Sequence, residues 1–128
     1  MKLLLDTCTF LWVASGSHRL SKTAATLFLN PENERYLSAA SAWEIGIKHA
    51  LGRLPLPAKP TAYIAKIRHA SGIEPLSVDE EAALYAASLP GIHADPFDRL
   101  LVAQAILQGM TILTPDEALQ QYPVRTAW

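Results

Sequence analysis

The stretch HADPFDRLLVAQAILQGMTILTPD, residues 93–116, decides the fold. Pro96 is typical of the first turn of a helix and Gly109 of a helix end, so the apolar run between them predicts a helix. The β-favouring residues Thr111–Leu113 follow directly and predict a short strand, after which the chain reaches Asp116. A helix that leads straight into a strand is the unit from which parallel α/β sheets are built.

The same alternation extends outward along the chain. Further strands are expected at residues 2–6, 35–38, 74–76 and 124–126. Helices are expected at residues 11–14, 21–30, 41–51, 61–70, 77–87 and 96–109, with a short one from Asp116 and a Pro-rich surface connection at 54–60. The pattern has no internal repeat and predicts an α/β fold with a mainly parallel sheet and helices on both faces.

Two local patterns refine these expectations. Ser77 and Glu80 have the spacing of a capping box, which would open the helix that follows them. Trp43, Ile47 and Leu51 share one face of the helix expected at 41–51. We expect Trp43, like Trp12, to belong to the core rather than to stack on a nucleic-acid base.

Length and composition bound the function. The chain has 128 residues, 50% of them hydrophobic, and is expected to form one domain, residues 1–128. The single cysteine, Cys8, allows no intrachain disulfide and favours a reducing compartment. Asp6 interrupts the apolar N-terminus too early for a signal peptide, and no stretch reaches the roughly 20 apolar residues that span a bilayer, so we expect a cytoplasmic protein. The net charge of -1 argues against a module that binds nucleic acid by charge alone.

Acidic residues fall where the expected strands end. In open parallel sheets, ligands bind at the carboxyl ends of the strands. Carboxylates gathered there need a cation, because desolvating an unpaired carboxylate is costly. Oxygen ligands favour Mg²⁺ or Mn²⁺ over zinc. The candidate site residues are Asp6, Glu44, Asp95, Asp98 and Asp116.

Each acid also has a purely structural interpretation. Asp6 and Asp116 could each cap the helix that follows. Glu44 and Lys48 have the spacing of an ion pair on a helix surface, which contributes only about 0.3–0.5 kcal/mol. Asp95, directly before Pro96, is a natural helix N-cap. The convergence of all these acids on one sheet edge is what favours a functional site.

At this point the chain resembles the PIN-domain ribonucleases, specifically the VapC-type toxins of bacterial toxin–antitoxin pairs. The resemblance rests on an ordered set of segments and covers nearly the whole chain. The matching segments are Leu4-Leu5-Asp6-Thr7 with Leu11-Trp12, Ser41-Ala42-Trp43-Glu44-Ile45 with Lys48, Gly52-Arg53-Leu54, His93-Ala94-Asp95-Pro96-Phe97-Asp98-Arg99, Leu101-Val102-Ala103-Gln104-Ala105, Ile112-Leu113-Thr114-Pro115-Asp116 and Tyr122-Pro123-Val124.

The resemblance implies a three-layer α/β/α sandwich with an acidic pocket that binds Mg²⁺ or Mn²⁺ and cleaves RNA. The acids of the family carry over onto Asp6, Glu44, Asp98 and Asp116, with Asp95 as an additional candidate. The resemblance further implies a homodimer and a cognate antitoxin whose C-terminal segment occupies the active-site groove. Cys8 departs from the subgroup, which usually has His there, but that position is not one of the metal-binding acids.

In this interpretation Asp6 and Asp98 hold the principal ion, while Glu44 and Asp116 complete its water-mediated shell or recruit a second ion. Other side chains have supporting roles. Thr7 and Thr114 are expected to hydrogen-bond the carboxylates. His93 is expected to make local hydrogen bonds in its loop rather than to act as a base. Lys48, Arg53 and Arg99 are candidates for phosphate contacts, or else ordinary surface or ion-paired charges.

Two other functions remain open. A phosphatase with Asp6 as nucleophile, as in the haloacid dehalogenase family, would need a second aspartate where this chain has Cys8. A catalytically silent PIN fold that only binds proteins would be expected to have lost one or more acids, and none is missing. A cysteine phosphatase is weaker still, because no arginine follows Cys8 to bind phosphate.

Overall fold

Five strands form one all-parallel sheet in the order β3-β2-β1-β4-β5. The computed structural model describes residues 1–128. The register places Leu4 beside Tyr36 on one side and beside Ile112 on the other. The strands are β1 (Lys2–Leu5), β2 (Glu34–Ser38), β3 (Ile73–Leu76), β4 (Thr111–Leu113) and β5 (Arg125–Ala127).

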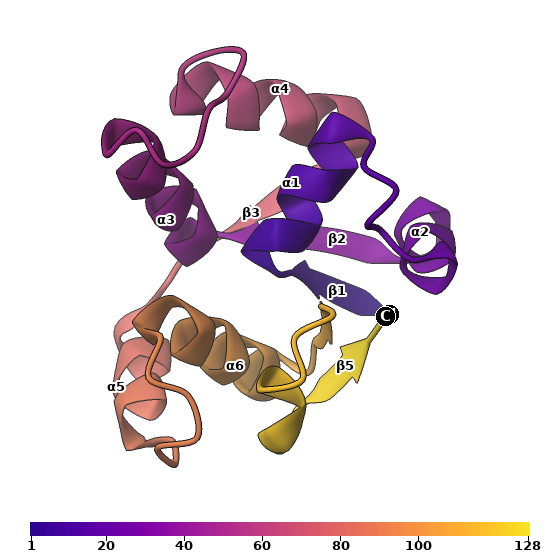
Figure 1. Cartoon of the computed structure of the whole chain (residues 1–128). Helices are drawn as coiled ribbons and strands as arrows, with labels where there is room; N and C mark the ends of the chain where they lie inside the picture. Colours follow the sequence, from indigo (N-terminus) through magenta and orange to yellow (C-terminus); the bar gives the residue numbers. More distant parts are fainter.

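Six helices cover the two faces of this sheet (Figure 1). They are α1 (Thr7–Ser15), α2 (Lys22–Leu29), α3 (Ala39–Ala50), α4 (Pro60–Ser71), α5 (Glu80–Ser88) and α6 (Pro96–Gln108), and a short 3₁₀ helix, η1 (Leu119–Gln121), precedes β5. In Figure 1, α3 and α4 lie above the sheet and α5 and α6 below it. The α/β/α sandwich expected from the sequence is therefore confirmed. No helix combines the length and the apolar character needed to cross a membrane.

The two layers of core follow from the alternation of side chains along each strand. Leu4 and Ile112 face α5 and α6 and pack with Leu101 and Val102. Their chain neighbours Leu5 and Leu113 point to the opposite face and pack with residues of α1, α2 and α3, including Phe10, Phe28 and Ile45. Strands buried on both faces read as unbroken apolar runs, which is why Leu3-Leu4-Leu5 was recognisable as a strand.

Most element boundaries agree with the expectation to within two residues, but two expectations were wrong. The helix at 11–14 is part of a longer one that already begins at Thr7. The capping box does not form. Asp79 caps α5 by accepting a hydrogen bond from the backbone N–H of Ala82, and the Ser77 carbonyl instead accepts one from Gln104. Gly52, by contrast, ends α3 as expected. Its φ is +70°, its N–H donates to the carbonyl oxygen of His49, and the N–H of Arg53 donates to that of Lys48.

The face of α3 was also misassigned. Trp43 and Leu51 are 64% and 61% exposed. The helix contacts the rest of the protein through other positions, namely Ala40, Ser41, Glu44 and Ile45.

The order of the strands creates a switch point between β1 and β4. From β1 the chain moves outward to β2 and β3, and it then crosses to the other side of β1 to form β4 and β5. The loops at the carboxyl ends of β1 and β4 therefore diverge and leave room for a ligand. Asp6 follows β1, and Thr114 and Asp116 follow β4, so the candidate acids lie at this switch point.

Candidate metal centre

A pocket of about 370 Å³ lies at the switch point, and all five candidate acids line it. Asp6 comes from the end of β1, Glu44 from α3, Asp95 and Asp98 from the start of α6, and Asp116 from the loop after β4. The only basic residues in the lining are Lys48 and Arg53. The predicted convergence of the acids is therefore present in the structure, and negative charge dominates the pocket.

Asp6 is almost completely buried, and both of its carboxylate oxygens accept hydrogen bonds. Its Oδ1 accepts from the backbone N–H of Thr7 at 2.7 Å, and its Oδ2 accepts from the hydroxyl of Thr114 at 2.7 Å. Burial raises the pKa of Asp6, the two hydrogen bonds oppose that rise, and the charges of Glu44 and Asp116 add to it. Asp6 is also the N-cap of α1, so its structural interpretation as a helix cap is confirmed.

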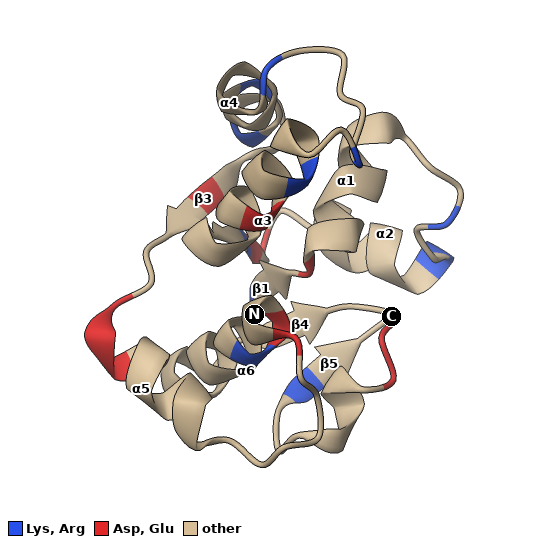
Figure 2. Cartoon of the chain, turned by 60° about the vertical axis from the view of Figure 1, so that its left-hand side comes forward, with Lys and Arg blue, Asp and Glu red and all other residues tan.

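Glu44 is held from two directions. The hydroxyl of Thr7 donates to Glu44 Oε1 at 2.7 Å and also lies 2.9 Å from the hydroxyl of Ser41. Lys48 Nζ lies 2.6 Å from Glu44 Oε2, so the expected ion pair between neighbouring turns of α3 does form. Figure 2 shows the acidic and basic positions of α3 as red and blue segments of its ribbon. Thr7 and Thr114 thus hydrogen-bond the carboxylates as expected, whereas Ser41 was not anticipated.

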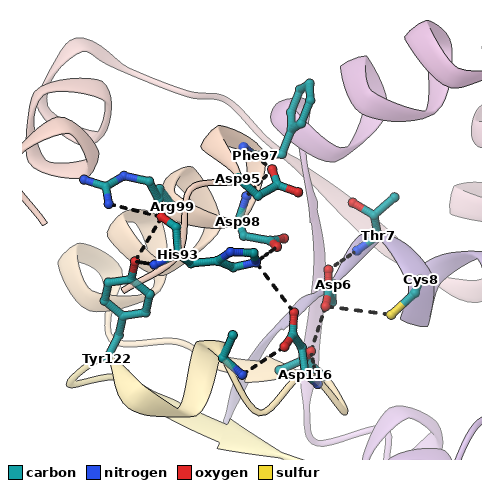
Figure 3. A network of polar contacts seen from close by, with 12 residues as sticks. Asp6, Thr7, Cys8, His93, Asp95, Phe97, Asp98, Arg99, Asp116 and Tyr122 are labelled. Carbon is teal, nitrogen blue, oxygen red and sulfur yellow. Dashed lines mark hydrogen bonds and ion pairs between the residues drawn. The ribbon is translucent and has the colours of Figure 1, made fainter. Parts of the chain in front are cut away.

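Asp98 faces His93 and lies in the middle of the network (Figure 3). The distance from His93 Nε2 to Asp98 Oδ2 is 2.8 Å, and the distance to Asp116 Oδ2 is 3.9 Å. Burial raises the pKa of Asp98 to about 7. The charges of Asp6, Asp95 and Glu44 add to this rise and His93 opposes it.

Asp95 and Asp116 are the acids with local structural partners. Asp95 Oδ1 accepts hydrogen bonds from the backbone N–H groups of Phe97 and Asp98, so Asp95 is the N-cap of α6, as expected from its place before a proline. Asp116 Oδ1 accepts from the backbone N–H of Ala118, and the Asp116 N–H donates to the hydroxyl of Thr114. Both carboxylates nevertheless keep their second oxygen for the pocket.

The side chain of Arg99 does not reach the pocket, so its proposed phosphate contact was wrong. Its guanidinium donates to the carbonyl oxygens of Ala86 and Ala87, at the end of α5, and of Leu89, Pro90 and His93, in the segment between α5 and α6. Arg99 therefore holds this segment in place.

His93 was expected only to make hydrogen bonds within its loop, and its imidazole instead reaches the acids. The sequence did contain a signal, because His93 precedes Asp95 and Asp98 in one short motif. The direction of the ring depends on loop geometry, which that motif does not encode.

Trp12 and Trp43, which were both expected in the core, are not fully buried, and the assignment of Trp43 to the core was wrong. Trp43 packs edge-on against Phe97 with ring centroids 5.5 Å apart, on the exposed side of α3. Trp12 is half-buried against Trp128, with centroids 5.7 Å apart.

Cys8 lies beside the acids without the properties of a nucleophile. Its Sγ is 3.7 Å from Asp6 Oδ2. Burial raises the pKa of the Cys8 thiol to about 12, and the negative charge of Asp6 contributes to this shift. The thiol is therefore neutral at physiological pH, which argues against thiolate chemistry.

The donor set fits a hard divalent cation. The carboxylates come from four separate parts of the fold and have few cationic partners. Neighbouring carboxylates help to raise the pKa of Asp6 and of Asp98, and a divalent ion would supply the missing counter-charge. The bonds from Thr7 and Thr114 orient the carboxylates of Glu44 and Asp6, as outer-shell hydrogen bonds do around metal ligands.

Comparison with known proteins agrees with this architecture. The chain is 49% identical over 47 residues to ribonuclease VapC16 of Mycobacterium tuberculosis, a match that covers 37% of this chain and only 33% of that relative. A chain in the structure of VapBC2 from Rickettsia felis, bound to a promoter DNA fragment, superposes with a TM-score of 0.71 at 14% identity, covering 99% of this chain and 98% of that one.

A chain of VapBC-1 from nontypeable Haemophilus influenzae gives a TM-score of 0.67 at 18% identity, covering 99% of this chain and 97% of the other. At such identities the structural matches establish the fold alone. The family model described as PIN domain matches residues 3–124, nearly the whole chain, and the protein therefore belongs to the PIN domain family.

Proposed function

We propose that this protein is a metal-dependent endoribonuclease, the toxin of a VapC-like toxin–antitoxin pair. The observation that carries the proposal is the pocket at the switch point, in which five carboxylates face two basic side chains. Membership of the PIN family and the partial match to a ribonuclease support it. The intact set of acids argues against a silent PIN fold that only binds proteins.

In the proposed site, Asp6 and Asp98 would hold a Mg²⁺ or Mn²⁺ ion, and Glu44 and Asp116 would complete its water-mediated shell or help to recruit a second ion. Such an ion polarises a phosphoryl oxygen and lowers the pKa of bound water. Thr114 keeps Asp6 oriented through the 2.7 Å hydrogen bond to Oδ2. Asp95 caps α6 and so fixes the position of Asp98 in the first turn of that helix.

The two basic residues of the pocket are suited to binding the RNA backbone. Lys48 is half exposed beside Glu44, and Arg53 is exposed at the same rim. Together they offer positive charge at the edge of a negative pocket, where a phosphodiester must approach. Because the whole chain has a net charge of only -1, it has no general basic surface for RNA, and the positive charges of Lys48 and Arg53 would serve this purpose at the pocket itself.

The proposal extends to partners. Two of the structural matches described above are VapBC assemblies, and a further one, with a TM-score of 0.63 at 14% identity, is a toxin–antitoxin complex from Klebsiella pneumoniae. We therefore propose a cognate antitoxin that silences this chain, a homodimeric state, and a cytoplasmic location, where the RNA substrate is found.

The test is cleavage of defined, end-labelled transfer, ribosomal and messenger RNAs by chelator-treated protein, before and after addition of Mg²⁺ or Mn²⁺. Asp98→Asn protein purified in parallel controls for contaminating nuclease. We expect cleavage by the wild type only when metal is present, and none by Asp98→Asn. Cleavage that persists in excess EDTA would contradict the mechanism, and a folded wild type that cuts no RNA with either metal would favour the silent PIN fold.

A further inference from the structure

We propose that His93 is an additional metal ligand of this centre, so that the site binds Mn²⁺ more tightly than Mg²⁺. This inference rests on the proposed metal-dependent function. It adds an imidazole nitrogen to a set of ligands that otherwise consists of oxygen atoms, and it thereby addresses which ion the site selects.

The geometry brings the imidazole to the acids. One ligand atom from each of His93, Asp98 and Asp116 lies within 4.8 Å of the others. These residues come from three places in the fold: the loop before α6, the first turn of α6, and the loop after β4. Figure 3 shows the ring of His93 pointing toward Asp98 and Asp116. An ion held by Asp98 would therefore lie close to the imidazole of His93.

The loop that carries His93 is anchored far more firmly than a surface connection requires. Arg99 donates to three of its carbonyl oxygens, including that of His93 itself, and to two more in the last turn of α5. The hydroxyl of Tyr122 accepts the backbone N–H of His93 at 2.9 Å and lies 3.2 Å from the carbonyl oxygen of Pro90. These bonds fix the backbone from which the imidazole extends, and none of them involves the ring, whose Nε2 lies 2.8 Å from Asp98 Oδ2. A ligand fixed in advance loses little conformational entropy when the ion binds.

A simpler alternative is that His93 serves only as a positive charge beside Asp98. The two interpretations differ in their consequences for metal binding. A cationic histidine would repel any divalent ion, so its removal would strengthen the binding of Mg²⁺ and Mn²⁺ alike. A neutral imidazole ligand favours a first-row transition ion over Mg²⁺, which prefers oxygen ligands and retains most of its water.

The experiment is pulsed electron paramagnetic resonance of Mn²⁺ bound to the full chain, without RNA. We expect the wild type to show the ¹⁴N coupling of a directly bound imidazole and His93→Gln to lose it. His69→Gln, a change at an exposed histidine of α4, is the matched control and should keep the coupling. Titrations should show Mn²⁺ affinity falling at least about tenfold in His93→Gln, with Mg²⁺ affinity changing far less.

Two outcomes would overturn the inference. One is wild-type protein whose bound Mn²⁺ shows no ¹⁴N coupling, a result that does not depend on the folding of any variant. The other is tighter binding of both ions by His93→Gln, as expected if the side chain is only a charge. RNA cleavage separates this inference from the proposed function: cleavage without ¹⁴N coupling contradicts the role of His93 alone, whereas ¹⁴N-coupled Mn²⁺ without cleavage contradicts the nuclease alone.

Discussion

Asp98 is the residue on which the electrostatics of the pocket act most strongly. Burial raises its pKa from the ordinary 3.8 to about 7, and the neighbouring carboxylates of Asp6, Asp95 and Glu44 contribute. In the absence of metal, the surroundings of Asp98 therefore disfavour its ionised form. A bound divalent ion would reverse this effect, because it favours the charged form of each acid.

The raised pKa predicts a pH dependence of stability in metal-free protein. Between about pH 4 and pH 7 the folded chain retains a proton on Asp98 that the unfolded chain has released, so the free energy of unfolding falls as the pH rises through this window. Asparagine does not titrate. In excess EDTA at pH 8, Asp98→Asn should melt higher than the wild type, by roughly 4 °C for each kcal/mol of relieved repulsion, and the difference should vanish near pH 4. Thermal melts at both pH values check this, and an Asp98→Asn melt below the wild type at pH 8 would show that the carboxylate is needed for the fold.

Cys8 is expected to be dispensable for RNA cleavage. Its thiol, with a pKa of about 12, is protonated at neutral pH and takes no part in the proposed chemistry. Cys8→Ser should keep RNA cleavage within about threefold of the wild type, since this change does not remove any carboxylate, and treatment with iodoacetamide at pH 7.5 should label the folded wild type slowly. Rates and mass spectra measure both. Loss of activity in a folded Cys8→Ser protein would revive a thiol mechanism.

At the scale of elements, the start of α6 divides two neighbouring acids between two tasks. Asp95 caps the helix by accepting from the N–H groups of Phe97 and Asp98, while Asp98 points toward His93 and the pocket. Asp95→Ala should cost about 1 kcal/mol of stability, as lost caps do, and leave reduced but measurable cleavage. Asp98→Asn should fold and be inactive. Denaturation curves and cleavage rates test the pair, and an active Asp98→Asn beside a dead Asp95→Asn would exchange the two assignments.

The conformation of the segment between α5 and α6 depends on hydrogen bonds from Arg99. Its guanidinium donates to carbonyl oxygens at the end of α5 and in the loop that follows, and hydrogen bonds from charged groups contribute about 1.5–3 kcal/mol each when broken singly. Arg99→Met should therefore lower the free energy of unfolding by roughly 2–4 kcal/mol. Urea denaturation measures this loss. A change below about 0.5 kcal/mol, which is typical of a surface substitution, would contradict the anchoring role.

The elements also show how far the sequence alone could lead. The strands buried on both faces could be predicted, and so could the helix between Pro96 and Gly109. Apolar runs and the residues that begin or end a helix act locally, so the sequence shows them directly. The exposed side of α3 was not predictable, since Trp43 follows the same helical spacing that a core residue would. The helix packs instead through its small residues and Ile45. Periodicity defines a face of a helix without showing which face the sheet will cover.

The same distinction applies to the candidate site. The convergence of Asp6, Glu44, Asp98 and Asp116 followed from their positions after strands and at helix starts, because the topology of a parallel sheet places those positions at one edge. The approach of His93 did not follow, since its loop is fixed by Tyr122, which is distant in the sequence. The metal-binding roles of the acids themselves remain predictions.

At the scale of the whole molecule, the strand order β3-β2-β1-β4-β5 is the feature that assembles the site. The chain leaves β1 and β4 in opposite directions, and α6 begins at the same edge of the sheet because it runs back toward β4. Acids from both halves of the chain therefore meet in one pocket, together with the basic rim formed by Lys48 and Arg53. The proposed nuclease activity depends on this meeting of distant segments more than on any single motif.

Anomalous scattering from crystals soaked in Mn²⁺ would locate the ion directly. We expect one strong peak in the pocket at the switch point, bonded to carboxylate oxygens of Asp6 and Asp98 at about 2.0–2.2 Å, and no such peak in crystals of Asp98→Asn. A well-occupied ion elsewhere on the protein, or an empty pocket at Mn²⁺ concentrations that support RNA cleavage, would show that the acids at the switch point are not the metal centre.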